Sequence, residues 1–273
     1  MWISYTVLFS SYYKKEELSR AMGTITAFNN GGILLGFAAG SLASEALGIP
    51  ALFWLSFGSG IAGFVVALFI KESGGVEAPP TIKELLSSIK NKRLIVFAIA
   101  AAVLQAVHMS TAMSFTSDVA KTLSTSDWQI GVCSMVYMAF CVASSYFAGS
   151  KAAARIGAKV LMPALFAFMA IYCVFVPFAP SMWVLLVLQV IGGTGNAALF
   201  SLLMTGAMQG VEQRKRSTAM GFFQAVYGVG MTLGPMLTGA VADGMGMTAA
   251  YFTMAAFAVI GIVIVILANR RNA

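Results

Sequence analysis

Eight long apolar runs most constrain how this chain of 273 residues can fold. Each run can cross the hydrocarbon core of a bilayer, which takes roughly 20 residues of helix. None has the strict polar-apolar alternation of a barrel strand, so we expect an all-α, polytopic membrane helix bundle. A shorter apolar stretch, Met1–Tyr13, resembles the tail end of a further helix. The eight runs cover about 19–46, 50–70, 94–117, 127–149, 160–178, 181–208, 217–243 and 247–268.

The composition supports a protein whose partner is the lipid bilayer. Hydrophobic residues make up 59% and charged residues 10% of the chain, against roughly 45–50% and 25% in soluble domains. The formal net charge of +7 could indicate nucleic acid, but the basic residues fall only between apolar runs, so no nucleic acid is expected. Three cysteines (Cys133, Cys141 and Cys173) lie within apolar runs without metal-ligand spacing, so neither a metal site nor a cofactor is expected.

The basic residues also predict an orientation. If the loop after Tyr13 is cytoplasmic, 16 of the 17 Lys and Arg residues fall on that side, and only Lys121 lies opposite. Cytoplasmic loops of membrane proteins carry such an excess. We therefore expect a multi-pass protein of the plasma or inner membrane with a cytoplasmic C-terminus.

Part of the chain is written twice at a constant offset of 198 residues. The segment Ser19–Gly23 (SRAMG) recurs as Ser217–Gly221 (STAMG), and the identities continue to Gly48 and Gly246. A parallel internal repeat in an apolar chain is typical of secondary transporters.

The repeat also predicts the domain organisation. Four helices separate the two copies, so one unit contains six helices and only the second unit is complete. We expect 1–70 to be the remnant of a first six-helix half, 71–92 a cytoplasmic linker with a short amphipathic helix near 82–89, and 93–273 the complete second half. The alternative is that eight helices form the whole natural protein.

A basic loop carries a resemblance to a known family. It reads GSKAAARIGAK from Gly149 to Lys159 and is similar to the loop signature of the major facilitator superfamily at Arg155, Gly157 and Lys159. It departs at Ala154, where the family has an acid, and at Ser150, where it has glycine. Together with the repeat and the basic linker, the loop makes the chain resemble helices five to twelve, plus the end of the fourth, of an N-terminally truncated member.

The resemblance implies a function for the full-length parent. Members of this family move a small-molecule substrate by alternating access, as symporters or antiporters, and we expect a monomer. A coupling proton or sodium ion would use His108 or residues of the missing helices, and the alternative is transport without a coupling ion. The fragment itself is expected to be inactive, because half the cavity wall and the partner of the Gly230/Gly234 helix are missing. The alternative is a non-transporting receptor or assembly subunit. An enzyme is not expected, since no cluster of catalytic residue types lies at membrane depth.

Polar residues in the apolar runs are the candidates for the substrate site. The resemblance places 94–117 and 181–208 around a central cavity, and polar side chains in lipid are costly enough to point inward. His108 has an ordinary pKa of about 6.5 and could relay a proton, or it could be a packed histidine bonded to a neighbour. Tyr137 and Ser134 are weaker candidates. The substrate-site candidates are Gln105, His108, Met109, Gln189, Thr194 and Asn196, with Asn29, Gln224 and Tyr227 from the duplicated helices.

Small residues in the duplicated helices predict close helix packing. Gly230, Gly234 and Pro235 resemble a motif of family antiporters, and Gly32, Gly36 and Gly40 form the corresponding stripe in the first copy. Polar residues that recur at equal depth, such as Thr26 and Asn30 in the first copy, could bind substrate or join helices. The run 192–196 (GGTGN) lacks the strand and lysine of a phosphate loop, so we expect a flexible break in a helix there.

Overall fold

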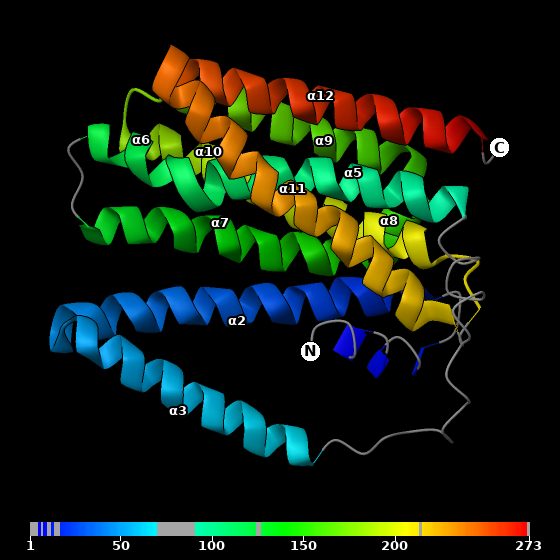
Figure 1. Ribbon diagram of the computed structural model, residues 1–273, viewed down its shortest axis with the longest axis horizontal. Helices are drawn as coiled ribbons and strands as arrows, with labels where there is room; N and C mark the ends of the chain where they lie inside the picture. The colour runs from blue at the N-terminus through cyan, green and yellow to red at the C-terminus, as the bar shows by residue number, and fades with distance from the viewer. Residues whose placement is uncertain are drawn as a thin grey trace.

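A computed structural model describes residues 5–6, 8–9, 12–13, 17–69, 91–123, 127–212 and 215–271. Within these residues the chain is a bundle of helices without a strand (Figure 1). The elements are α2 (Leu18–Leu47), α3 (Ile49–Leu68), α5 (Lys92–His108), η2 (Met109–Phe115), α6 (Thr116–Thr122), α7 (Asp127–Ala148), α8 (Lys151–Ile156), α9 (Ala158–Phe175), η3 (Val176–Phe178), α10 (Met182–Met208), α11 (Arg216–Met245) and α12 (Met247–Arg271).

Each of the eight predicted runs is helical, which confirms the expected fold class. Seven helices in the described part of the chain are long and apolar enough to cross a membrane. The eighth, α2, has 30 residues, includes Asn29 and Asn30, and is not among these seven. The amphipathic helix expected near 82–89, and most of the stretch Met1–Tyr13, lie outside the described residues.

The internal repeat is visible in the helix boundaries. Helices α2 and α11 both have 30 residues and are offset by 198 positions at each end. The turns that follow them also match, since Gly48 has φ 79° and ψ 174° and Gly246 has φ 87° and ψ 164°. A residue with a side chain rarely adopts this backbone conformation, so glycine is required at both turns.

Two helical features were not predicted. The loop after α7 forms the short helix α8, whose first turn is capped by Ser150 Oγ accepting from Ala153 N at 3.2 Å. The run 94–117 is not one α-helix, because α5 passes into a π-helix at Met109–Phe115. Ser114 Oγ donates to Met109 O five residues earlier, at 2.7 Å.

The expected break at 192–196 is wrong. Helix α10 runs without interruption from Met182 to Met208. Its glycines admit neighbouring helices: a Cβ on Gly192 would lie 2.8 Å from the ring of Tyr172, and one on Gly195 would lie 3.0 Å from Leu165 O, both on α9. Gly193 lies against the backbone of Tyr137 on α7. Packing against two helices on different sides keeps this segment helical despite its low intrinsic propensity.

Helix α11 crosses α5 at Gly230 and Gly234. A Cβ on Gly234 would lie 2.6 Å from Ala106 Cα, and Gly230 lies against the backbone of Ala102. The expectation that the partner of this helix is missing is therefore wrong, because the partner is α5. The stripe of Gly32, Gly36 and Gly40 on α2, in contrast, has no neighbouring atom within 4 Å among the described residues.

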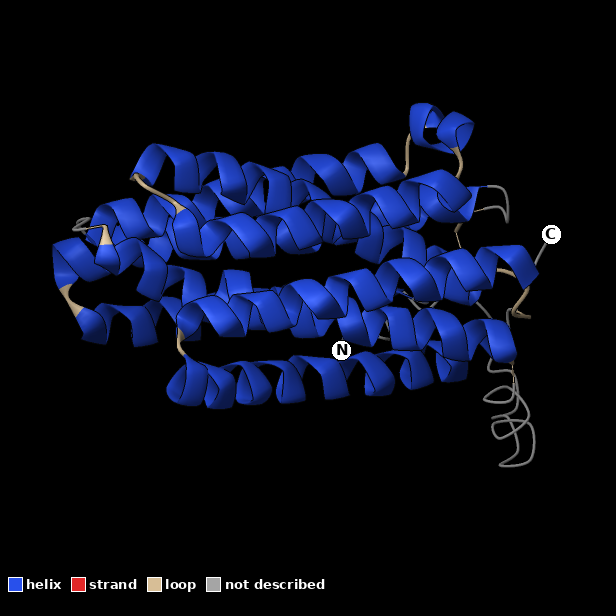
Figure 2. Cartoon of the chain, turned by 90° about the horizontal axis from the view of Figure 1, so that it is seen from above, coloured by secondary structure: helices blue, strands red, loops and turns tan. Residues whose placement is uncertain are grey.

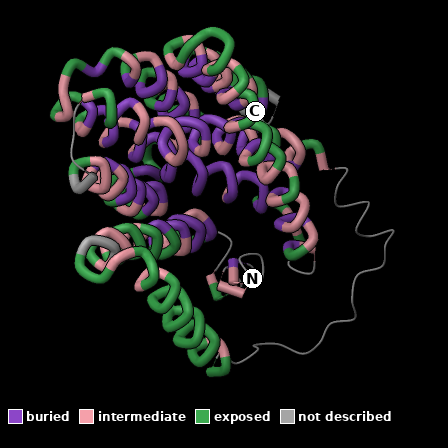
Figure 3. The backbone as a smooth tube through the Cα atoms, turned by 60° about the vertical axis from the view of Figure 1, so that its left-hand side comes forward, coloured by how far each residue is buried: buried purple, intermediate pink, exposed green. Residues whose placement is uncertain are grey.

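Most of the described core residues lie in the helices from α5 onward, while α2 packs along one side of these helices. Helix α2 packs on α7, where a Cβ on Gly23 would lie 2.6 Å from Ser145 O. Helix α3 contacts α2 but contains no buried residue, and it extends away from the bundle (Figure 3). Seen from above, the long helices run roughly side by side along one common direction (Figure 2).

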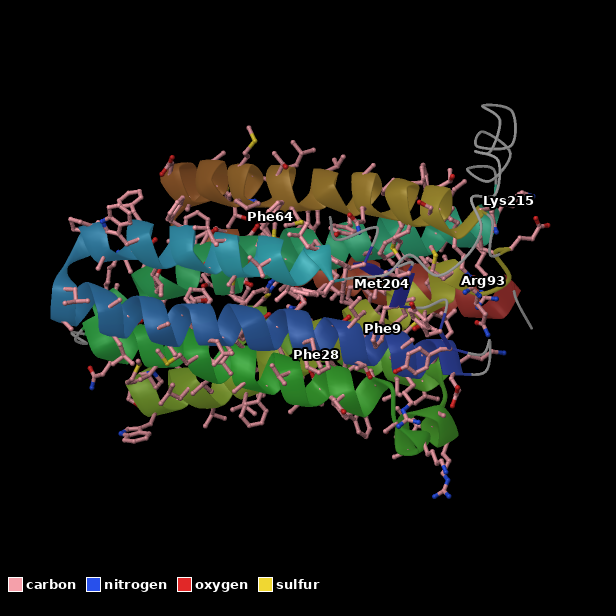
Figure 4. The ribbon with its side chains drawn as sticks, turned by 90° about the horizontal axis from the view of Figure 1, so that it is seen from below. Phe9, Phe28, Phe64, Arg93, Met204 and Lys215 are labelled. Carbon is pink, nitrogen blue, oxygen red and sulfur yellow. The ribbon has the colours of Figure 1, made fainter. Side chains whose placement is uncertain are left out.

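The basic residues gather at one end of the bundle. Arg93 and Lys215 lie together there (Figure 4), close to the end where α8 lies and opposite the end that carries α6 (Figure 1). Arg93 fastens the start of α5 to the end of α10, since its Nε donates to Gly206 O at 2.9 Å. Lys121 lies on α6, at the other end.

Candidate functional site

A polar pocket lies between helices of both repeat copies. It has a volume of about 270 Å³ and receives side chains from α2, α5, η2, α10 and α11. A pocket with a few converging polar groups in an apolar surround is the usual form of a small-molecule site. Its lining consists of Thr26, Asn29, Asn30, Ile33, Gln105, His108, Met109, Asn196, Ala197, Phe200, Tyr227 and Met231.

Six of the nine candidate residues line this pocket. They are Gln105, His108, Met109, Asn196, Asn29 and Tyr227. The other three lie outside the lining: Gln189 is buried on α10 about two turns before Asn196, and Thr194 and Gln224 are half-buried. Helix spacing brought Gln105, His108 and Met109 together, as their positions i, i+3 and i+4 predict.

An aromatic wall of the pocket was not predicted. Phe200 and Tyr227 meet edge to face with ring centroids 5.5 Å apart, and Phe223 closes the cluster behind them at 5.6 Å from Tyr227. Phe200 lies one helical turn after Asn196, so it shares the face of α10 that carries this candidate. That spacing was the signal available in the sequence.

His108 joins the pocket to a buried hydroxyl. Its ring is 7% exposed, and its Nδ1 lies 2.9 Å from the hydroxyl oxygen of Tyr137 on α7. The two rings are nearly parallel, with centroids 5.5 Å apart. His108 is thus both a packed histidine bonded to a neighbour and part of the pocket wall, and Tyr137 is closer to the site than the sequence indicated.

Two amide oxygens on pocket residues have no hydrogen-bond partner. Gln105 Oε1 and Asn196 Oδ1 are buried and unpaired, although Asn196 Nδ2 donates to Cys141 Sγ. Buried polar atoms are nearly always paired in folded proteins, so each such group needs an explanation. A ligand that fills the pocket can supply the missing partners.

The comparison with known families decides the class of this protein. A family model described as Major Facilitator Superfamily matches residues 1–118 and 97–273. The chain belongs to the major facilitator superfamily. It is therefore a multi-pass membrane protein of a family whose members transport small solutes. A search among curated proteins found no match.

Four long helices supply polar residues to the lining of the pocket. Gln105 and His108 come from α5, and Asn196 comes from α10. Helices α2 and α11, the duplicated pair, add Asn29 and Tyr227.

Two polar residues of α2 take part in packing as well as in lining the pocket. Asn30 Nδ2 donates to Ser145 Oγ of α7 at 3.3 Å, and Thr26 Oγ1 donates to Met22 O of its own helix at 2.8 Å. Asn29, in contrast, is exposed. Of these three, Asn29 is the side chain left to contact a solute.

The basic loop that carried the resemblance is accessible. Arg155 and Lys159 are exposed at the end of α8 and the start of α9, and Gly157 between them has φ 85°. Ser150, which replaces the family glycine, caps α8. The loop is therefore ordered by a cap and a glycine turn.

A larger hollow of about 690 Å³ lies along the outside of the α5 and α11 crossing. Its lining is apolar and includes Val229, Leu233 and Met236, which are 55%, 55% and 65% exposed. Without polar groups to orient a solute, this hollow is a poor substrate site. In the described part of the chain, no three His, Cys, Asp or Glu residues gather as metal ligands.

Proposed function

We propose that this protein takes part in secondary active transport of a small solute by alternating access, and that the polar pocket is the solute site. The observation that carries the proposal is the pair of unpaired amide oxygens, Gln105 Oε1 and Asn196 Oδ1, on residues that line a pocket between the two repeat units. Transporters with internal repeats hold their substrate at such an interface.

The proposal includes the domain organisation and the orientation. Residues 1–70 belong to a first six-helix half, 71–92 to the linker and 93–273 to the second half, with the C-terminus cytoplasmic and the protein acting as a monomer. A proton or sodium ion couples the movement, and His108 is the described pocket residue able to relay a proton. The exposed loop residues Arg155 and Lys159 act in the conformational change.

A further helix is expected to cover α2 in the transport-competent protein. The repeat relates Gly230 and Gly234, which pack on α5, to Gly32 and Gly36, which have no neighbour among the described residues. Equivalent surfaces in a repeat take equivalent partners. We therefore infer that a helix equivalent to α5 packs on Gly32 and Gly36 in the transporting protein.

Ligand binding can be tested on the chain as it is. The purified protein in detergent is heated in the presence of separate neutral and charged solutes, including monosaccharides, polyols, nucleosides, amino acids and carboxylates. A ligand at 100 times its Kd stabilises the folded state by about 2.7 kcal/mol, which raises the melting temperature. Gln105→Leu is expected to abolish the shift. Gln189→Leu is the matched control, because Gln189 is also a buried glutamine with an unpaired oxygen but lies outside the pocket.

Uptake separates a transporter from a receptor that has kept the fold. Proteoliposomes containing the chain joined to the helices that complete its first six-helix half are expected to accumulate the solute that binds, against its gradient, when a proton or sodium gradient is imposed. Binding without any uptake would favour the receptor or assembly subunit. No binding to any solute, with Gln105→Leu and the unaltered chain behaving alike, would contradict the assignment of the pocket.

A further inference from the structure

The hydroxyl of Tyr137 is enclosed by the bundle and has a single neighbour for its hydrogen. Tyr137 is 1% exposed and lies on α7, and α10 approaches it closely because Gly192 and Gly193 carry no side chain. The hydroxyl oxygen lies 2.9 Å from His108 Nδ1, within hydrogen-bond distance. No other described residue bonds to this hydroxyl.

The direction of this hydrogen bond follows from its surroundings. If Nδ1 carried the hydrogen and donated, the hydroxyl hydrogen of Tyr137 would be buried without an acceptor. If the hydroxyl donates, its hydrogen is paired, because a neutral imidazole accepts at the nitrogen that has no hydrogen. The hydrogen of His108 is then on Nε2, and His108 lines the pocket, where a solute or water can accept it. Leaving a buried donor unpaired is the costlier choice, so Tyr137 donates to Nδ1.

A histidine that accepts at Nδ1 carries its hydrogen on Nε2. The partner of one ring nitrogen thus sets the state of the other. Nε2 has no hydrogen-bond partner among the described residues, and His108 lines the pocket with Gln105 and Asn196 as its polar neighbours there. No carboxylate is among the described lining residues to pair with a charged imidazolium.

We propose that Tyr137 is a positioning residue that fixes the tautomer of His108, so that the pocket presents the Nε2–H of a neutral imidazole to an acceptor oxygen of the solute. The tautomer stands on the geometry of the pair alone, and the contact with the solute rests on the function proposed above. The unpaired oxygen of Gln105, one turn away on α5, then takes a donor of the same solute. The ligand class is a neutral solute with an acceptor oxygen and a neighbouring hydroxyl or N–H group.

The test is a nitrogen-15 NMR spectrum of the ring, because His108 is the only histidine in the chain. The purified protein is labelled at histidine alone, so every ring signal comes from one residue. At neutral pH the unaltered protein is expected to show one directly bonded hydrogen, on Nε2, and an unprotonated Nδ1. The Nε2–H tautomer should exceed the Nδ1–H tautomer by about tenfold, because the free energy of one net hydrogen bond corresponds to a ratio of this order.

Tyr137→Phe removes the hydroxyl and keeps the ring that stacks on His108. It is expected to lower the tautomer ratio about tenfold, with signals of both neutral forms. Tyr172→Phe is the control: it removes a buried hydroxyl from a ring 6.2 Å from Tyr137, but that hydroxyl bonds to Thr116 and not to His108. The control should leave the histidine spectrum unchanged.

Three results would overturn the proposal. One is an unaltered protein with the hydrogen on Nδ1 or with both nitrogens protonated at neutral pH, which decides the matter even if Tyr137→Phe does not fold. The second is a folded Tyr137→Phe variant with the same spectrum as the unaltered protein. The third is an equal change in Tyr172→Phe. None of these readouts needs a solute, so failure of the transport proposal would leave the tautomer result intact.

Discussion

Gly234 of α11 lies so close to Ala106 of α5 that a Cβ added to it would come within 2.6 Å of the Ala106 Cα. A Cβ added to its repeat counterpart on α2, Gly36, would have no atom of another described helix within 4 Å. The same glycine stripe thus meets a helix in one copy and open space in the other. This difference gives a matched pair of substitutions within one chain.

Gly234→Ala is expected to lower the free energy of unfolding by about 1–3 kcal/mol, because a methyl group forces two backbones apart. Gly36→Ala should leave the free energy of unfolding unchanged or raise it by about 0.5–1 kcal/mol, because alanine is the better helix former. The measurement is thermal unfolding in detergent, followed by circular dichroism. Equal losses in both variants would mean that the packing of α11 on α5 does not depend on Gly234.

Thr116 joins three helical segments at the end of the π-helix. Its Oγ1 lies 2.8 Å from the hydroxyl of Tyr172 on α9 and 3.1 Å from that of Tyr251 on α12, and it is 2.9 Å from Thr111 O. All of these side chains are buried. A single hydroxyl therefore serves two buried tyrosines.

Thr116→Val keeps the shape of the side chain and removes these bonds. We expect a loss of about 1–3 kcal/mol, because buried hydroxyls are left unpaired. Hydrogen exchange should become faster in 109–122, the segment that Thr116 holds in place. Thr122→Val is the control, since its exposed hydroxyl bonds only within α6, to Val119 O. Faster exchange in the control alone would contradict the role given to Thr116.

His108 offers a second test of the pocket, through substitutions that mimic one ring nitrogen each. A glutamine amide reaches the position of Nε2, while the shorter asparagine amide reaches that of Nδ1. If the solute contacts Nε2–H, His108→Gln should keep most of the thermal shift given by a binding solute. His108→Asn should raise the Kd of the solute by about tenfold or more, and a tenfold change corresponds to about 1.4 kcal/mol of binding free energy.

Both variants are compared using the solute panel described above. Without solute, each variant must melt at the same temperature as the unaltered protein, so that any difference in the shift reports binding. Equal binding by both variants would mean that the solute does not contact Nε2–H. Stronger binding by His108→Asn would assign the contact to the other nitrogen.

The sequence predicted the parts of the fold that depend on local pattern. Run length and hydropathy located the helices, and the repeat predicted that α2 and α11 share their boundaries. The pocket was predicted where helix spacing alone decides, as at Gln105 and His108. It was not predicted where other helices decide how far the pocket extends: Gln189 lies on the same helix and nearly the same face as Asn196, but two turns along α10 and outside the lining.

Glycine and tyrosine residues show the same limit. The glycines at 192–196 predict a break when read alone, yet α7 and α9 press on them and the helix continues. Tyr137 was only a weaker candidate, and its bond to His108 was not predicted, because the two residues are 29 positions apart on different helices. Contacts between helices, rather than propensity, decide such positions.

The sidedness of the chain can be tested with single cysteines. The native Cys133, Cys141 and Cys173 are 2%, 0% and 0% exposed, so a water-soluble maleimide should not label the folded protein. Lys151→Cys, Glu212→Cys and Lys121→Cys each add one accessible thiol, since all three side chains are exposed.

In sealed vesicles of known orientation, the cysteines at 151 and 212 should react from the cytoplasmic side and the one at 121 from the opposite side. This follows because an even number of membrane spans separates 151 from 212, while an odd number separates either from 121. Labelling of 151 and 212 from opposite sides would contradict the predicted helix count and the assignment of residues 93–273 as one six-helix unit.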